Sequence, residues 1–302
     1  MMSEHEQAEL ARDFLLEPYD YTMETADPPE LGIRVRPETV ARVAAVMTHE
    51  STSLPITTAE AAELAGFVKP TAVKVLGGMA ANGMLDIELD KRSGGGRRAR
   101  LYTPLQPLDD AVAQNTLWRR EKQRYDLRNG LECSNDDELD DRLLLMAETL
   151  LDADPLPDGD GVARALQEAY DYGDELPGVA PQMDGISPQT VQQVAVAARN
   201  SGGRAFDVPG IAEASSLPYG TVAQIVKTLH DDDMVALVGN NRHAGGQFRL
   251  YVPTDRLYDG FEADSDWRRA WQAGSLATRL ACGPNELQDR MLGAAYLVTD
   301  MQ

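Results

Sequence analysis

The sequence has few of the features that mark membrane, secreted or disulfide-bonded proteins. Its 302 residues contain no run of about 18 apolar residues, so no membrane span is expected. The acidic start, from Met1 to Glu6, has no basic and then apolar leader, so we expect no secretion signal. Two cysteines cannot form a disulfide framework. A cytoplasmic protein is the simplest interpretation.

Residues suited to catalysis or metal binding are also scarce. Cys133 and Cys282 have no histidine or cysteine neighbour at the spacing of a metal site, so we expect small apolar side chains rather than ligands. Aspartate pairs are too common for any one of them to indicate acid–base chemistry. The histidines are scattered, at His5, His49, His230 and His243. We therefore expect no enzymatic activity, no metal and no cofactor.

Lysine is rare, and the net charge is strongly negative. The 28 basic residues include five lysines, which leaves 23 arginines, and the net charge is −21. This bias resembles that of proteins from salt-loving archaea. An acidic protein of a mesophile is the alternative. The charge is uneven: the net charge is −9 over residues 1–65, −14 over 129–186 and −3 over 187–302, whereas residues 66–128 carry +5. One positive block in so acidic a chain suggests a surface that faces phosphate.

The positive block contains a helix followed by a hairpin. Lys69 to Ala81 has apolar residues at helical spacing, and Asn82-Gly83 is typical of a helix end. Met84 to Leu89 alternates like a strand, Asp90 to Arg98 is a basic and glycine-rich tip, and Ala99 to Thr103 returns as a second strand.

The residues before this helix predict two more helices and a short strand. A helix is expected from Pro37, which favours a first helical turn, to Met47. Leu54 to Ile56 is a candidate strand. Thr57 and Glu60 form a predicted capping box for a helix that runs to Ala65. A three-residue turn, 66–68, then leads into the helix at Lys69.

This order of elements resembles the winged helix-turn-helix superfamily. The resemblance implies that the helix from Lys69 enters the major groove of double-stranded DNA, and that the hairpin, or wing, contacts phosphate.

The same plan recurs later in the chain. Arg100-Leu101-Tyr102 resembles Arg249-Leu250-Tyr251 at a spacing of 149, and so does Trp118-Arg119-Arg120 with Trp267-Arg268-Arg269. Val73, Leu76 and Ala80 align with Val222, Ile225 and Leu229 at 149, the segments from Arg36 and Ser187 align at 151, and those from Glu138 and Glu286 at 148. Near-constant spacing over about 110 residues indicates an internal duplication.

The predicted fold class is α+β, mainly α with small β-wings, with two duplicated winged helix-turn-helix domains. Each domain carries a helical extension. The predicted boundaries are an acidic tail over 1–35, domain one over 36–151, an acidic linker over 152–186 with one short helix from Val162 to Tyr172, and domain two over 187–302.

The first domain supplies most of the predicted DNA-binding residues. Its recognition helix is expected to expose Lys69, Thr71, Lys74, Val75 and Gly78, with Val73, Leu76 and Met79 in the core. The wing would add Lys91, Arg92, Arg97, Arg98 and Arg100, for which a solvated hairpin is the alternative. Trp118 is expected to anchor the extension by packing. For Arg119, Lys122 and Arg124 both ion pairing and phosphate contact stay open.

The second domain has a weaker set. Its helix, which begins at Pro218, would expose Tyr219, Gly220, Gln224 and Lys227, and its wing has Arg242. Gln224 has the chemistry to pair with an adenine edge. Asp231 to Asp233 would repel phosphate. Weaker DNA binding and a role in protein contact are equally compatible with this set.

The resemblance implies a transcriptional regulator that binds double-stranded DNA, alone, as a homodimer or with other subunits. Two alternatives stay open. Tandem winged domains also occur in replication or partition proteins of plasmids and viruses, and in non-catalytic subunits of chromosome-organising complexes.

Overall fold

The computed structural model describes residues 4–89, 99–153, 159–176, 178, 180–181, 183, 185–243 and 246–299. Within them the fold is mainly helical, with two small three-stranded antiparallel sheets, so the coarse α+β prediction is confirmed. The chain forms two compact units, Met1–Ala169 with Asn285–Gln302, and Tyr170–Pro284. None of the helices in the described ranges has the length and apolar character of a membrane span.

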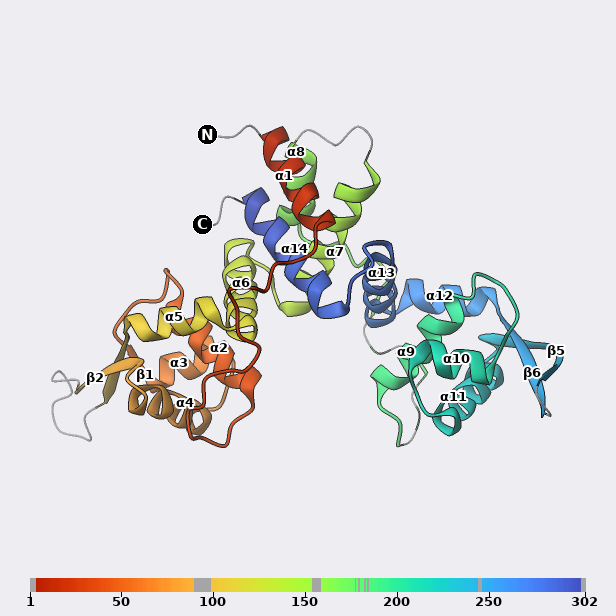
Figure 1. Cartoon of the computed structure of the whole chain (residues 1–302), viewed down its shortest axis with the longest axis horizontal. Coiled ribbons are helices and arrows are strands. Elements are labelled where there is room, and N and C mark those ends of the chain that lie inside the picture. The colour runs from red at the N-terminus through yellow and green to blue at the C-terminus, as the bar shows by residue number, and fades with distance from the viewer. Residues whose placement is uncertain are drawn as a thin grey trace. The chain divides into compact units, whose positions relative to one another are not determined.

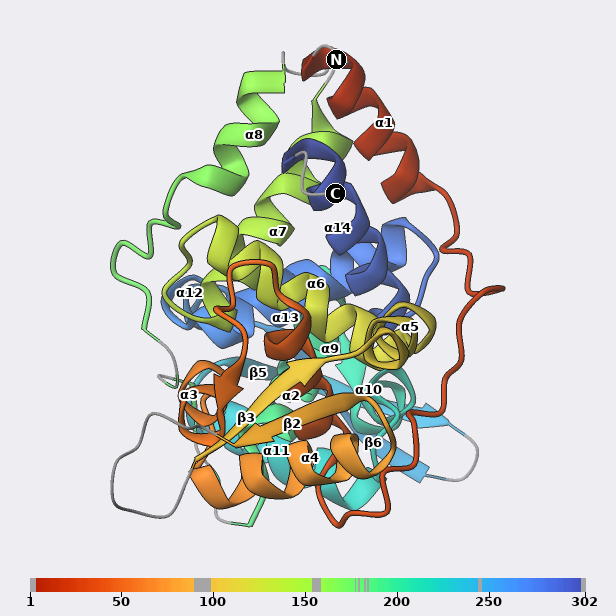
Figure 2. The ribbon, with the colours of Figure 1, turned by 90° about the vertical axis from the view of Figure 1, so that its left-hand side faces the viewer.

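In the first unit, a group of helices lies beside a three-stranded sheet (Figures 1 and 2). Strand β3 lies between β1 and β2, and both of its pairings are antiparallel. The elements are α2 (Pro37–Thr48), β1 (Ile56–Thr57), α3 (Thr58–Leu64), α4 (Lys69–Ala81), β2 (Leu85–Leu89) and β3 (Arg100–Pro104). All of them lie within two residues of the predicted bounds.

Local signals explain where these elements begin and end. Pro37 occupies the first turn of α2. The Thr57 hydroxyl accepts from the Glu60 backbone N–H while the Glu60 carboxylate accepts from the Thr57 N–H, which completes the predicted capping box. Gly83 follows α4 with φ of 71°, a conformation that favours glycine.

The buried face of α4 differs by one position from the prediction. Val75 is fully buried and Gly78 is also buried, whereas Val73 is 46% exposed. The reason is a strap, residues 31–35, that packs beside the helix. A Cβ on Gly78 would lie 3.0 Å from Ile33 Cγ2 and 3.3 Å from Leu31 Cβ, so glycine allows the strap to approach closely. Leu76 and Met79 are in the core as predicted.

The second unit repeats this order of elements. Strand β6 lies between β4 and β5, again with antiparallel pairing. The elements are α9 (Pro188–Arg199), β4 (Phe206–Asp207), α10 (Val208–Ser215), α11 (Tyr219–Asp231), β5 (Val235–His243) and β6 (Gly246–Pro253).

Burial sets the correspondence between α4 and α11. The buried residues of α11 are Val222, Ile225, Val226 and Leu229, and those of α4 at the same spacing are Ala72, Val75, Leu76 and Met79. The equivalent positions therefore differ by 150, and the predicted pairing of Val73 with Val222 is wrong by one residue. After the hairpins the difference is 149, because Ile87 pairs with Tyr102 and Leu237 with Tyr251.

Each sheet is followed by three helices. Asn115 caps α6 by accepting from the Trp118 backbone N–H, and Asp264 does the same for Trp267 in α13. Trp118 is fully buried and Trp267 is 2% exposed, so both anchor their helices by packing, as predicted for Trp118. The helices are α5 (Gln106–Gln114), α6 (Thr116–Gly130), α7 (Asp136–Asp152), α12 (Asp255–Ala263), α13 (Ser265–Arg279) and α14 (Pro284–Thr299).

Four helices from distant parts of the sequence gather in the first unit: α1, α7, α8 and α14 (Figures 1 and 2). Helix α1 (Glu4–Leu16) lies in the predicted acidic tail, and α8 (Gly159–Gln167) lies in the predicted linker, earlier than the expected Val162–Tyr172. Helix α14 ends the second half of the sequence, yet it belongs to the compact unit of the first half. The compact units thus divide the chain differently from the predicted domain boundaries.

Two adjacent glycines of α4 give a matched test of the strap contact. Gly78→Leu should lower the free energy of unfolding by about 1–3 kcal/mol, because the added side chain must displace Leu31 and Ile33. Gly77→Leu should be neutral or stabilising by up to about 1 kcal/mol, since a Cβ there meets nothing within 4 Å and leucine favours helix over glycine. Urea unfolding of both variants measures this, and equal effects would contradict the packing described.

Candidate nucleic-acid interface

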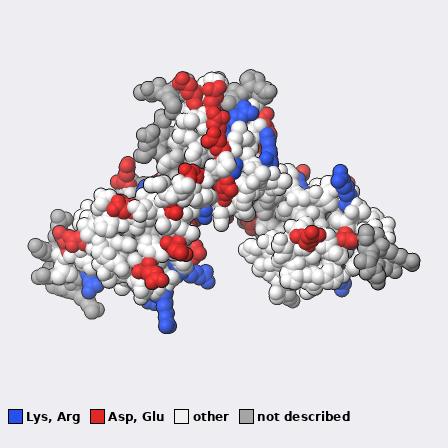
Figure 3. All heavy atoms as spheres, viewed as in Figure 1, with Lys and Arg blue, Asp and Glu red and all other residues white. Residues whose placement is uncertain are grey.

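Helix α4 presents one solvent-exposed stripe, which we define as Lys69, Pro70, Val73, Lys74 and Gly77. Lys69 and Lys74 are exposed, and the half-buried Gly77, which has no side chain, lies between them around the helix. Thr71, also predicted for this face, is only half-buried at its edge. Figure 3 shows basic side chains projecting from the lower edge of the first unit, where α4 lies in Figure 1. The stripe combines two cations with a small apolar side chain.

The cations of the α4 stripe are available to a ligand. Within the described part of the chain, no carboxylate forms a salt bridge with Lys69 or Lys74. Neither lysine is buried, so their charges stay in water at no desolvation cost. Helix α4 also has no acidic residue in its first turn, which leaves the positive end of the helix dipole uncompensated there.

The β2–β3 hairpin adds one described cation. Arg100 is exposed at the start of β3, opposite Leu89, and has no salt bridge to a described residue. Asp86 and Glu88 are exposed on β2, so the base of the hairpin is not cationic overall. The other predicted wing residues, Lys91, Arg92, Arg97 and Arg98, lie outside the described residues.

Helix α11 presents the equivalent stripe with different chemistry. Tyr219 is 53% exposed, and Gln224 and Lys227 are exposed beside it, as predicted. With the difference of 150, Tyr219 stands where α4 has Lys69, Gln224 where it has Lys74, and Lys227 where it has Gly77. One cation, one amide and one aromatic ring therefore replace the two lysines.

The β5–β6 hairpin adds a cation that was missed at the sequence level. Arg249 is exposed opposite Asn240, in the place that Arg100 occupies in the first hairpin. Its position in the aligned Arg-Leu-Tyr segments was the available signal. The backbone of Arg242 in β5 pairs with that of Gln247 in β6, but the side chain of Arg242 lies outside what the structure describes.

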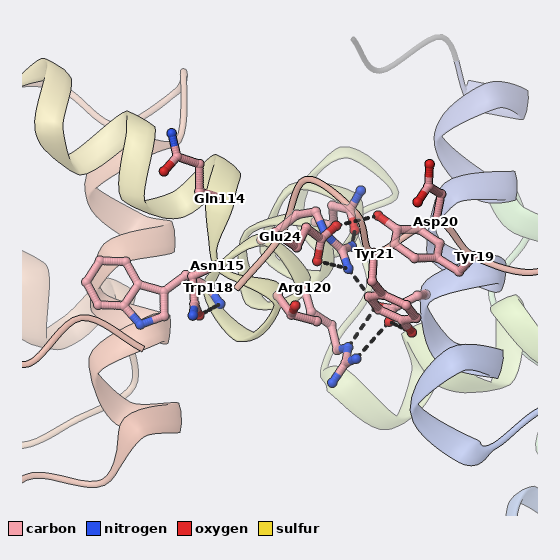
Figure 4. Close-up of polar contacts among 12 residues, drawn as sticks. Tyr19, Asp20, Tyr21, Glu24, Gln114, Asn115, Trp118 and Arg120 are labelled. Atoms are coloured by element: carbon pink, nitrogen blue, oxygen red, sulfur yellow. Dashed lines mark hydrogen bonds and ion pairs between the residues drawn. The ribbon is translucent and has the colours of Figure 1, made fainter. Parts of the chain in front are cut away.

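The basic residues of α6 are all engaged in ion pairs, which favours the packing interpretation over phosphate contact. Arg119 and Arg120 both bind the carboxylate of Asp289 in α14, at 3.0 and 2.8 Å. Figure 4 shows Arg120 directed to this side of α6 and Trp118 to the other. The remaining pairs are Lys122 with Asp126, Arg124 with Asp140, and Arg128 with Asp136.

Asp289 is completely buried, and its partners keep it charged. Burial alone would raise its pKa, but hydrogen bonds from Arg120, Tyr21 and Arg119 outweigh burial and hold the pKa of this carboxyl below its usual range. The Tyr21 hydroxyl donates to Asp289 at 2.6 Å. The Arg119 guanidinium also lies 4.8 Å from the ring centre of Tyr19 and forms a 2.8 Å ion pair with Glu24.

One cluster has the residue types of a hydrolytic triad but not its geometry. Ser51 Oγ lies 2.7 Å from His49 Nδ1, while His49 Nε2 is 3.6 Å from Asp126 Oδ1, too far for a hydrogen bond. Asp126 already pairs with Lys122 and accepts from the Tyr296 hydroxyl. The cluster cannot orient the histidine as a base for Ser51. No group of three metal-ligating side chains occurs among the residues described.

Comparison with known protein families, curated proteins and solved structures yields no match to this chain.

The ion pairs of α6 lead to a stability prediction. Arg120→Gln should lower the free energy of unfolding by about 3–5 kcal/mol at neutral pH, because it removes a partner from a buried carboxylate. The depressed pKa of Asp289 stabilises the fold above the ordinary aspartate pKa, and this contribution is lost as pH falls. The difference between the variant and the wild type should therefore shrink below about pH 4. Thermal unfolding between pH 3 and 7 measures it, and a constant difference would contradict the assignment.

Proposed function

We propose that this protein is a non-catalytic, double-stranded DNA-binding protein, a transcriptional regulator with two winged helix-turn-helix domains. The observation that carries the proposal is that the basic residues divide into an ion-paired set and an exposed set. The cations of the extension helix α6 are consumed by buried or half-buried carboxylates, whereas Lys69, Lys74 and Arg100 are exposed without a described partner. In a chain with a net charge of −21, such a local excess favours phosphate as a ligand.

The α4 stripe has the chemistry to read base edges. A lysine donates to the guanine O6 and N7 acceptors of the major groove, and a valine methyl can contact the methyl group of thymine. Val73 and Lys74 are adjacent on the stripe, and Gly77 lets the helix backbone approach a surface closely. Lys69 at the first turn and Arg100 in the hairpin are the candidates for phosphate contact.

Several equivalences support an internal duplication that begins earlier than the sequence spacing indicated. Arg268 pairs with Glu175 at 2.7 Å and lies 4.5 Å from the ring centre of Tyr170, as Arg119 does with Glu24 and Tyr19. In this proposal α8 is the counterpart of α1. Two copies in one chain would act as a covalent pseudo-dimer on half-sites about 34 Å, or a multiple of that, apart.

The two stripes differ, so the proposed half-sites need not be identical. Gln224 offers a paired donor and acceptor suited to adenine, where α4 has Lys74. Asp231 to Asp233, at the C-terminal end of α11, place negative charge on and beside this helix. We propose that the second domain makes fewer phosphate contacts and contributes more through hydrogen bonds.

High salt would suit such an interface. At molar ionic strength the Debye length is about 3 Å, so counterion release contributes little affinity. Direct hydrogen bonds and apolar contacts to base edges keep their value there. The few lysines of the stripes are consistent with a protein that binds DNA at short range.

Phosphate contact is tested by Lys69→Gln with Arg100→Gln. The double variant should bind a random-sequence duplex roughly 10-fold more weakly at about 0.1 M salt, and the slope of log affinity against log salt should fall by about 2. Fluorescence anisotropy measures both quantities. The matched control is Arg164→Gln with Arg256→Gln, which removes two charges from side chains that are 64% and 63% exposed in other helices. If both double variants lost the same affinity, the loss would follow from the change in net charge alone, which would contradict the proposed contacts.

Base readout is tested by Lys74→Ala. Sequences selected from a random duplex library should lose their preference at one or two positions, each worth roughly 10- to 100-fold in affinity. Affinity for non-selected DNA should change little. Gln224→Ala is the paired variant and should alter a different set of positions. A uniform loss of affinity with an unchanged selected sequence would show that Lys74 does not read bases.

A further inference from the structure

Helix α14 is fixed to the first half of the chain through its contact with α1. Arg290 of α14 is 3% exposed, and its guanidinium donates to the backbone carbonyls of Leu15 and Leu16, at 3.3 and 3.5 Å. These carbonyls end α1, where the helix dipole is negative and the last carbonyls lack helical partners. Glu286 pairs with the same arginine. A charge at the end of α1 therefore holds the two helices together.

Helices α7 and α8 form the same kind of contact, but the half that supplies the arginine and the half that supplies the helix end are exchanged. Arg142 of α7 is also 3% exposed, and it donates to the carbonyls of Leu166 and Gln167 at the end of α8, at 2.9 and 3.3 Å. Glu138 pairs with this arginine, as Glu286 pairs with Arg290. In one contact the first half supplies the helix end and the second half the arginine. In the other contact these roles are reversed.

Two further contacts join α6 of the first half to α14. Asp289 accepts from Arg119 and Arg120, as described above (Figure 4). The Tyr296 hydroxyl, seven residues or about two helical turns further along α14, donates to Asp126 at 2.8 Å. Asp289 is completely buried and the other side chains of these contacts are half-buried, which makes the contacts to Asp289 the most costly to break.

Helices α1 and α14 also pack closely through apolar side chains. A Cβ on Gly293 of α14 would lie 2.1 Å from the ring of Phe14 in α1, so only glycine fits without displacing that ring. The apolar core of this region includes residues that are at most 2% exposed from all four helices: Ala11, Leu15, Leu143, Met146, Val162, Leu166, Leu287 and Leu292.

We propose that the two halves of the chain hold each other through a reciprocal exchange of terminal helices, with α14 seated on α1 and α6 and with α8 seated on α7. The partner of each half is the other half. This interface, and not the covalent segment between Ala153 and Gly159, keeps both winged domains in one particle. The proposal does not depend on DNA binding, so either one can fail without the other.

The test is to cut the intact, folded protein. A protease site placed between Ala153 and Gly159 allows the full chain to be cleaved after folding. The two fragments should stay together in a 1:1 complex that elutes with the uncut chain in size-exclusion chromatography, also after dilution to nanomolar concentration. Separation of the fragments under these conditions would overturn the proposal.

Variants within the cleaved protein locate the interface. Asp289→Ala should raise the apparent dissociation constant between the fragments at least about 100-fold, because Arg120 loses its carboxylate partner and Arg119 keeps only Glu24. Exchange of a fluorescently labelled fragment measures this constant. Tyr21→Phe is a milder variant that removes a single hydrogen bond to Asp289, and it should weaken association roughly 5- to 10-fold while the fold is kept.

The control is Arg164→Gln in α8, whose pair with Glu168 is exposed at 64% and 72%. It should leave fragment exchange unchanged within about 2-fold. Unaltered association in both Asp289→Ala and Tyr21→Phe, or equal weakening by the control, would place the interface elsewhere and refute the exchange.

Discussion

The need to neutralise buried carboxylates is the constraint on which the rest of this structure depends. A carboxylate removed from water is costly unless it is paired and hydrogen-bonded. Asp289 is completely buried. It accepts hydrogen bonds from two arginines and a tyrosine that are distant in sequence. Arginine suits this role because its planar fork can bind both carboxylate oxygens, as Arg120 does. The abundance of arginine over lysine is therefore partly a structural feature and not simply a sign of a nucleic-acid ligand.

The same constraint makes the unpaired cations informative. The positive charge of residues 66–128 divides into a paired set on α6 and an exposed set on α4 and β3. The paired set stabilises the fold and has no charge left for phosphate. The exposed set has no described structural partner, and Lys69 and Lys74 lie on one face of one helix. Net charge over a segment could not separate the two sets, because the carboxylate partners of α6 lie partly outside that segment.

Local signals in the sequence predicted the elements well, and long-range packing explains what they missed. The bounds of these elements were predictable because each depends on only a few neighbouring residues. Examples are the capping box at Thr57, the turn at Gly83 and the alternation in β2. The ion pairs of Arg119 and Arg120 with Asp289 join residues about 170 positions apart, and no sequence pattern near α6 indicates them. The placement of α14 in the first unit has the same origin, since it is decided by contacts with α1 and α6.

The face of α4 that is assigned to the core depends on how α4 is aligned to α11. Val73, Val75 and Leu76 are all apolar, so periodicity within α4 leaves its buried face ambiguous by one position. At the spacing of 149 indicated by the sequence, Gln224 and Lys227 of α11 match Val75 and Gly78 and indicate the wrong face. At the spacing of 150 given by burial, they match Lys74 and Gly77. Once α4 is aligned to α11 at 150, Val73 moves from the core to the exposed stripe. The core positions of the two helices then match in kind, while their stripes differ in charge and size.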